Sequence, residues 1–200
     1  LMPAVALKEL QRMCDDCPAF PWPMAMEVIE AELGCPVGDV FIGLNSDEPA
    51  KEPVAAASLG QVYCWRLRSD GSKVAVKVQR PSMAHVVALD IFILRKLAWL
   101  VRETIRRITH ARVDHVALLD AWACGTIKEL DYENEARNQD RFREQLGRLF
   151  GKKVYVPAVQ HDFSTQHVLV SEWVDGPRLS DCSPSVIRNL CPVGVECFLA

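Results

Sequence analysis

The fold is decided by the stretch Ser58-Leu59-Gly60-Gln61-Val62-Tyr63-Cys64-Trp65-Arg66-Leu67, the turn Ser69-Asp70-Gly71-Ser72 and the segment Lys73-Val74-Ala75-Val76-Lys77-Val78-Gln79. The first segment alternates apolar and polar residues, as a half-buried strand does. Asp70-Gly71 suits a tight turn because glycine adopts positive φ without steric cost. The last segment is rich in β-branched residues, and Pro81 ends it because proline cannot donate to a strand ladder. The whole stretch therefore predicts a β-hairpin.

Helical patterns precede this hairpin. One covers Ala4–Met13, and a second has Pro23 in its first turn and Gly34 as its C-terminal stop. Glycine and proline recur between Cys35 and Val54, which predicts a connection with a short strand at Val40–Ile42.

Two long helices are predicted after the hairpin. The first covers Met83–Ile108 and carries apolar residues at core-like spacing, namely Val86, Val87, Leu89, Ile93, Leu94, Leu97 and Leu100. Asp114 can cap the second, which runs to about Leu149 and is interrupted or strained near Gly125.

The last quarter of the sequence predicts strands at Val154–Val156 and His167–Val170, a loop at Trp173–Pro177 and a helix over Val186–Leu199. Helices, a hairpin, two long helices and a closing hairpin together predict an α+β fold.

Composition excludes several classes of protein. The net charge of −3 over 200 residues argues against a nucleic-acid-binding surface, which needs clustered positive charge. No apolar run reaches the length of a membrane span.

The eight cysteines are irregularly spaced, and the lone pair Cys14 and Cys17 lacks a second pair at zinc-finger spacing, so we predict no metal at the cysteines. Both ends resemble cuts, so any targeting peptide is expected to lie outside the sequence.

Lys77 is the candidate with the most specific chemistry. Strand alternation puts Lys77 and Ala75 on one face, with Val74, Val76 and Val78 on the other. A strand lysine that projects into a cleft can bind the α- and β-phosphates of a nucleotide, and the small Ala75 leaves room for an adenine ring. Taken alone, the pattern favours the alternative of a solvated strand lysine.

A run of small residues precedes this lysine: Ala55, Ala56, Ala57, Ser58, Leu59 and Gly60, followed by Val62. A small-residue loop in a hairpin upstream of Val-Ala-Val-Lys is the layout of a kinase nucleotide-binding lobe. Small side chains let backbone N–H groups approach a phosphate, although alanine restricts φ where glycine does not. The alternative for the run alone is the start of a helix.

An acidic cluster follows further along the chain, with Glu129, Asp131, Glu133 and Glu135 in seven residues. These carboxylates repel one another unless a positive charge lies nearby. The alternative is a solvated helix face.

Three motifs carry a resemblance to a known family: AAASLGQV at 55–62, VAVKVQRP at 74–81 and ELDYENEA at 129–136. They closely resemble the UbiB family of atypical kinase-like proteins, and the likeness runs from Leu10-Gln11 to Gly176. The resemblance implies a protein-kinase-like N-terminal lobe with a helical extension and a helical insertion, followed by a truncated C-terminal lobe. The implied domains are an extension over 1–50, the lobe with its inserted helices and hinge over 51–176, and the start of the second lobe over 177–200.

The resemblance also implies roles for individual residues. Glu135 is the helix glutamate that pairs with Lys77, despite a separation of 58 residues (135 − 77), which the inserted helix explains. Glu129 and Asp131 match a Glu-x-Asp motif of the family. Val168–Gly176 is similar to the strand and hinge between kinase lobes, so backbone groups of Glu172, Trp173 and Val174 would bind the adenine edge.

The implied function is that of an ATP-binding atypical kinase or ATPase that supports prenylquinone or lipid metabolism. ATP is the expected ligand, and the Mg²⁺ ligands are expected beyond Ala200, so the sequence by itself is expected to be inactive. Expected partners are a membrane surface or proteins of the lipid or quinone pathway. The expected location is the chloroplast, with the mitochondrion as the alternative. The rival functions are a pseudokinase scaffold and a helical interaction module.

Overall fold

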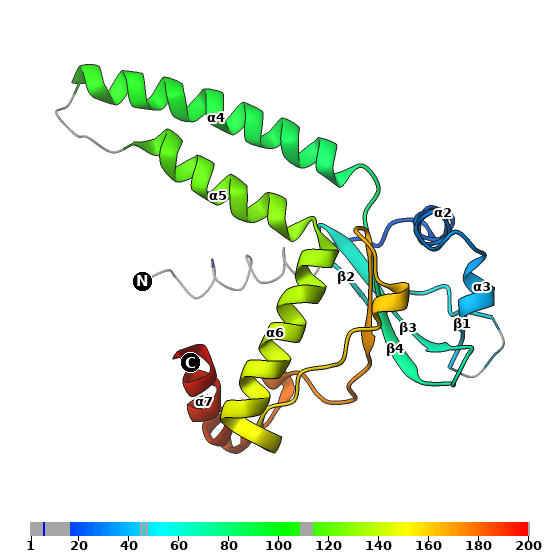
Figure 1. Ribbon diagram of the computed structural model, residues 1–200. Helices are drawn as coiled ribbons and strands as arrows, with labels where there is room; N and C mark the ends of the chain where they lie inside the picture. The colour runs from blue at the N-terminus through cyan, green and yellow to red at the C-terminus, as the bar shows by residue number, and fades with distance from the viewer. Residues whose placement is uncertain (1–5, 7–16, 45, 47, 109–113, 200) are drawn as a thin grey trace.

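Figure 1 shows the computed structural model of the chain, which describes residues 6, 17–44, 46, 48–108 and 114–199. Its centre is an antiparallel sheet in the order β1 (Phe41–Ile42), β3 (Gly60–Leu67), β4 (Lys73–Gln79) and β5 (Val168–Glu172). A short strand, β2 (Ala55–Ala56), pairs with the start of β3. The α+β fold and the central hairpin are confirmed.

The described residues also form helices. They are α2 (Trp22–Leu33), α3 (Val37–Val40), α4 (Met83–Ile108), α5 (His115–Glu129), α6 (Tyr132–Phe150) and α7 (Pro184–Leu199), with short 3-10 turns at η1 (Gly151–Lys153), η2 (His161–Phe163) and η3 (Leu179–Asp181). In Figure 1, α4 and α5 form an antiparallel pair that projects from the sheet. None of the helices among the described residues is long and apolar enough to cross a membrane.

The sheet separates a large core from a small one. Ala25 and Ile29 of α2 pack with the buried valines of β4 and β5, and the aromatic rings of Tyr63 and Trp65 stack in the same cluster with centroids 4.7 Å apart. On the opposite face, Leu169 of β5 packs against α6. Since successive strand residues point to opposite faces, this alternation brings α6 to the face that carries Lys77.

The prediction that β3 is half-buried was wrong, because six of its eight residues are buried. The strand has neighbours along both edges, with β1 and β2 on one side and β4 on the other. Even the polar Gln61 is only 1% exposed, and Cys64 on the opposite face is 6% exposed. Burial raises the pKa of the Cys64 thiol.

The helix ends follow local chemistry in most places. Gly34 ends α2 with φ of 70°, and Gly71 takes φ of 72° in the hairpin turn, as predicted. Asp114 caps α5 by accepting from the N–H groups of Val116 and Ala117. The predicted interruption near Gly125 was wrong. The helix α5 continues through Gly125 and ends before Leu130, and α6 starts at Tyr132.

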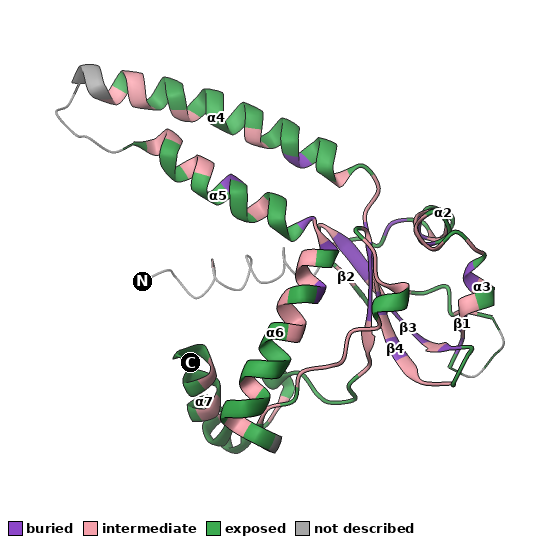
Figure 2. Ribbon diagram, in the orientation of Figure 1, coloured by how far each residue is buried: buried purple, intermediate pink, exposed green. Residues whose placement is uncertain are grey.

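The predicted core of α4 was also largely wrong. Of its seven apolar residues at core spacing only Val87 is buried, and the other six are 39–56% exposed. Figure 2 shows most of α4 and α5 exposed. The helices α4 and α5 pack against each other away from the sheet. Because α5 covers only part of α4, most of the apolar stripe of α4 stays exposed.

Two predictions near the ends have other outcomes. Val154–Val156 forms no strand, since the chain there leaves η1 in an irregular conformation. In place of the predicted closing hairpin, an isolated antiparallel bridge joins Val159 to Ser171 of β5, which also pairs with β4. The helix predicted over Ala4–Met13 lies, apart from Ala6, outside the described residues, as does Cys14.

Gln61 ties the N-terminal segment to the sheet. Its amide oxygen accepts from the Phe20 N–H at 2.9 Å, and its amide nitrogen donates to the Phe20 carbonyl at 3.3 Å and to the Tyr63 hydroxyl. All these atoms lie in buried surroundings, where an unpaired polar group is costly.

We predict that Gln61→Leu lowers the free energy of unfolding by about 2–4 kcal/mol, because it leaves two buried backbone groups of Phe20 without partners. Denaturant unfolding of the purified protein measures the change. Glu27→Gln, on the exposed side of α2, is the control and is expected to change stability by less than about 0.5 kcal/mol. Equal stability of Gln61→Leu and the wild type would contradict this account.

Candidate functional site

The candidate site is built around an ion pair between β4 and α6. Lys77 faces away from the core, whereas Val74, Val76 and Val78 are fully buried on the opposite face, as predicted. The Lys77 ammonium lies 2.7 and 2.6 Å from the two carboxylate oxygens of Glu135. The expected pairing across 58 residues is therefore present.

This pair is exposed enough that its contribution to stability is small. The side chains of Lys77 and Glu135 are 34% and 39% exposed. Ion pairs of that exposure contribute roughly 0–1 kcal/mol because water screens the attraction. The pair serves to fix the direction of the ammonium more than to hold the fold together.

The start of α6 is held to the end of β4, and this sets the position of Glu135. The side-chain amide of Gln79 donates to the Leu130 carbonyl at 2.7 Å. Asp131 caps α6 by accepting from the Asn134 N–H at 3.1 Å. The Tyr132 N–H donates to the Gln166 carbonyl at 3.1 Å. Glu135 follows one turn into a helix whose first turn is thus bonded to its surroundings.

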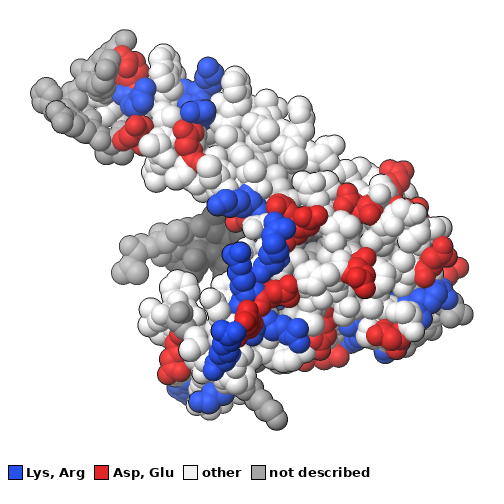
Figure 3. Space-filling model, in the orientation of Figure 1, with Lys and Arg blue, Asp and Glu red and all other residues white. Residues whose placement is uncertain are grey.

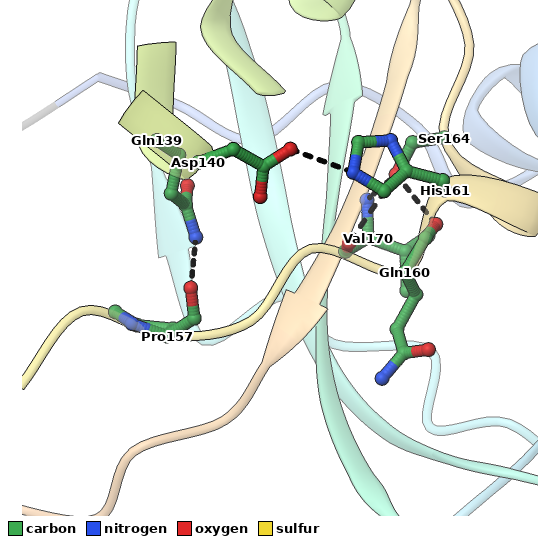
Figure 4. Close-up of polar contacts among 7 residues, drawn as sticks. All are labelled: Gln139, Asp140, Pro157, Gln160, His161, Ser164 and Val170. Carbon is green, nitrogen blue, oxygen red and sulfur yellow. Dashed lines mark hydrogen bonds and ion pairs between the residues drawn. The ribbon is translucent and has the colours of Figure 1, made fainter. Parts of the chain in front are cut away.

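The middle of α6 has a second set of supports, shown in Figure 4. The Gln139 amide donates to the Pro157 carbonyl at 3.0 Å, and the Asp140 carboxylate lies 2.7 Å from Nε2 of His161. Both side chains point from α6 toward the segment that leads to β5.

That segment is itself bonded to β5. The Ser164 hydroxyl accepts from the Val170 N–H at 3.0 Å and donates to the Gln160 carbonyl at 2.8 Å. The Gln160 N–H donates to the Val170 carbonyl at 2.8 Å. α6 is therefore linked to the sheet at two places, on either side of Glu135.

The run of alanines forms a strand and a turn, and the helix-start alternative is wrong. Ala55 and Ala56 pair with Val62 and Gln61 of β3, and the Ala57 N–H donates to the Gly60 carbonyl at 2.8 Å. We call residues 57–60 the alanine turn. Val62 lies opposite Lys77 in the register of β3 and β4, so the turn is close to the ammonium.

Gly60 is required in this turn by close packing. A Cβ at this position would lie 2.4 Å from the Val78 carbonyl oxygen and 2.8 Å from the Tyr132 hydroxyl. Both distances are far below van der Waals contact, and the first is to backbone. Only glycine lets the turn approach β4 and α6 so closely.

A cleft of about 480 Å³ lies between the turn and α6. Four of its lining residues were predicted as site residues, namely Leu59, Lys77, Glu129 and Glu135. Four others were missed, namely Lys128, Tyr132, Asn134 and Asn138. Tyr132 and Asn138 stand three residues before and after Glu135, so helical spacing from Glu135 was the signal that could have found them.

The acidic cluster has positive partners. Glu135 binds Lys77, and Arg137 lies 3.5 Å from both Glu133 and Asp131. Asp131 caps α6 and is absent from the residues that line the cleft. Figure 3 shows acidic and basic side chains interleaved over this part of the molecule. The cluster is thus more than the solvated helix face of the alternative interpretation.

The predicted hinge lies at the end of β5, away from the residues that line the cleft. The N–H groups of Glu172 and Trp173 donate within the chain, to Ala158 and Lys73 at 2.8 and 3.0 Å. Lys73 also forms an ion pair of 2.7 Å with Asp175. In the part of the chain that the structure describes, the Val174 N–H has no hydrogen-bond partner, unlike the other two hinge N–H groups.

We predict that Gly60→Ala destabilises the protein by about 1–3 kcal/mol, because the added methyl group must displace the backbone of β4. Gly125→Ala is the matched control, since a Cβ there meets nothing within 4 Å and alanine favours the α5 helix. Thermal or denaturant unfolding of both variants checks the difference, and a Gly60→Ala variant as stable as Gly125→Ala would contradict it.

Known proteins are similar to this chain in sequence. Residues 12–190 match the ABC1 atypical kinase-like domain. The chain is 43% identical, over 98% of its length, to an uncharacterized chloroplastic aarF domain-containing protein kinase of Arabidopsis thaliana. It is 35% identical over its whole length to Protein ACTIVITY OF BC1 COMPLEX KINASE 3, chloroplastic, of the same plant. It is 31% identical over 99% of its length to "Probable protein kinase UbiB" of Aeromonas salmonicida.

The chain spans 26%, 27% and 36% of the length of these three relatives. The family match covers the sheet, the alanine turn, Lys77 and Glu135. By this match and by identity along nearly all of its residues, the chain belongs to the ABC1 atypical kinase-like family, which includes UbiB.

Proposed function

We propose that the protein containing this chain binds ATP in the cleft between the alanine turn and α6 and acts as an atypical kinase-like ATPase. The observation that carries the proposal is the Lys77 ammonium, which Glu135 holds 2.6–2.7 Å away at a cleft of about 480 Å³. A cleft of this size is in the range of small-molecule sites. The fold class of the family supports the same conclusion.

The residues present fit the phosphate end of a nucleotide. Lys77 supplies a cation that binds phosphate as a point charge. The alanine turn reaches the same cleft through Leu59. Lys128 brings a second cation to the same cleft. Glu135 orients Lys77 by bonding it from the side of α6.

We assign the adenine end of the nucleotide to the face of the sheet that carries Lys77. Ala75 and Val62 lie next to Lys77 on this face, and the Val174 N–H is the one remaining hinge donor. We assign the base to the small side chain of Ala75 and the Val174 N–H.

We assign the magnesium ligands to another part of the protein, as the resemblance to the family implies. Within the described residues, no group of three or more His, Cys, Asp or Glu side chains can hold a metal ion. Mg²⁺, when bound with ATP, neutralises the charge that develops on the phosphates. The residues of this chain would hold and orient the nucleotide. Residues in the rest of the intact protein would bind the metal ion.

The wider role that we propose is support of prenylquinone or lipid metabolism in the chloroplast. Two of the relatives named above are chloroplastic, and one bears the name ACTIVITY OF BC1 COMPLEX KINASE. A membrane surface or proteins of a quinone or lipid pathway are the proposed partners. The competing function is a pseudokinase scaffold that binds partners without phosphoryl transfer.

We predict that Lys77→Met weakens binding of ATP to the intact protein by about 10- to 100-fold, because a charge-assisted hydrogen bond to phosphate contributes about 1.5–3 kcal/mol. Isothermal titration calorimetry measures the change. Lys96→Met is the matched control, since Lys96 lies on α4, outside the cleft. Equal affinities of the wild type and Lys77→Met would sink the proposed site.

Hydrolysis distinguishes the ATPase from the scaffold. We predict that the intact protein hydrolyses ATP in a magnesium-dependent manner and that Lys77→Met abolishes this activity, whereas the 200-residue chain alone has none. Phosphate release measures all three. Binding of ATP without hydrolysis by the intact protein would favour the scaffold, and hydrolysis by the 200-residue chain would refute the assignment of the metal ligands to the remainder.

A further inference from the structure

Tyr132 lies beside the ion pair of Lys77 and Glu135. It is 1% exposed, on the first turn of α6, three residues before Glu135. The Lys77 ammonium lies 4.5 Å from the centroid of its ring. The ammonium is therefore between an aromatic face and a carboxylate, and both attract a cation.

The hydroxyl of Tyr132 points toward the alanine turn. A Cβ on Gly60 would lie only 2.8 Å from it, so the hydroxyl occupies the space that glycine leaves open. It is buried and has no hydrogen-bond partner within the described part of the chain. Burial, and then the nearby Glu135 carboxylate, raise the pKa of Tyr132, so the phenol stays neutral.

A tyrosine that only filled the core would not need this placement. Its neighbours in the small core are Ala136 and Leu169, with Val159 packed alongside, and an apolar ring would fill that space without an unpaired hydroxyl. The ring of Tyr132 contacts the Lys77 ammonium, and its hydroxyl lies close to Gly60 at the end of the alanine turn. Both neighbours belong to the proposed nucleotide site.

We infer that Tyr132 is a positioning residue of the nucleotide site, because its ring holds the Lys77 ammonium at the cleft. The expected effect of Tyr132 on ATP affinity rests on the proposed function. Its first step, the placement of Lys77, is measurable without any nucleotide.

The first experiment measures the accessibility of Lys77 in the intact, nucleotide-free protein. An N-hydroxysuccinimide acetate ester acylates lysine side chains, and peptide mass spectrometry gives the rate at Lys77 relative to Lys128, which lines the same cleft. Tyr132→Leu is expected to raise this ratio by about 2- to 30-fold, the range that corresponds to loss of a cation–π contact. Tyr132→Phe keeps the ring and is expected to leave the ratio unchanged.

The second experiment measures ATP affinity by calorimetry on the same variants. Tyr132→Leu is expected to weaken binding by a similar factor, and Tyr132→Phe to retain at least a third of the wild-type affinity. Tyr63→Leu is the control for a purely structural effect, because Tyr63 is equally buried but lies on the opposite face of the sheet. It is expected to change neither the acylation ratio nor the affinity of the folded protein.

An unchanged acylation ratio in Tyr132→Leu would overturn the inference. So would a Tyr132→Phe variant that behaves like Tyr132→Leu, or a Tyr63→Leu variant that reproduces the effects. If the ratio rises as expected but the intact wild-type protein binds no ATP, the proposed function fails, whereas the placement of Lys77 by Tyr132 stands.

Discussion

The contact between Lys77 and Glu135 joins the two elements on which the candidate site depends, a strand of the central sheet and the helix α6. The pair itself is too exposed to contribute much to stability. Its geometry is imposed by bonds elsewhere. Gln79 and Gln166 hold the first turn of α6, and Gln139 and Asp140 hold its middle. The site is therefore a consequence of how firmly α6 is attached to the sheet.

The alanine turn also packs closely against β4 and α6. It approaches β4 and α6 until a single methyl group on Gly60 would collide with backbone. Close approach brings the cations of Lys77 and Lys128 and the backbone of the turn around one cleft. A glycine-rich loop would leave φ free at several positions, whereas in this turn Gly60 alone lacks a side chain and provides the clearance.

Much of the fold and part of the site could be predicted from the sequence, for reasons that differ between residues. The bounds of β4 and α4 and the turns at Gly34 and Gly71 depend on local chemistry, and these predictions are confirmed. The burial of β3 and the exposure of α4 depend on which neighbours cover them, and both predictions failed. Lys128, Tyr132, Asn134 and Asn138 were missed because only the packing of α6 brings them to the cleft.

The sequence by itself determined the hairpin, the face on which Lys77 lies and the membership of the family, because strand alternation, turn chemistry and ordered motifs are properties of neighbouring residues. The family resemblance already implied that Glu135 pairs with Lys77, and the structure gave the distance between them. The tertiary structure alone decided that Gly60 must lack a side chain and that the Lys77 ammonium lies over the ring of Tyr132. Those facts depend on distances between separate elements. Such distances are set by the packing of α6 on the sheet, to which residues far apart in the chain contribute together.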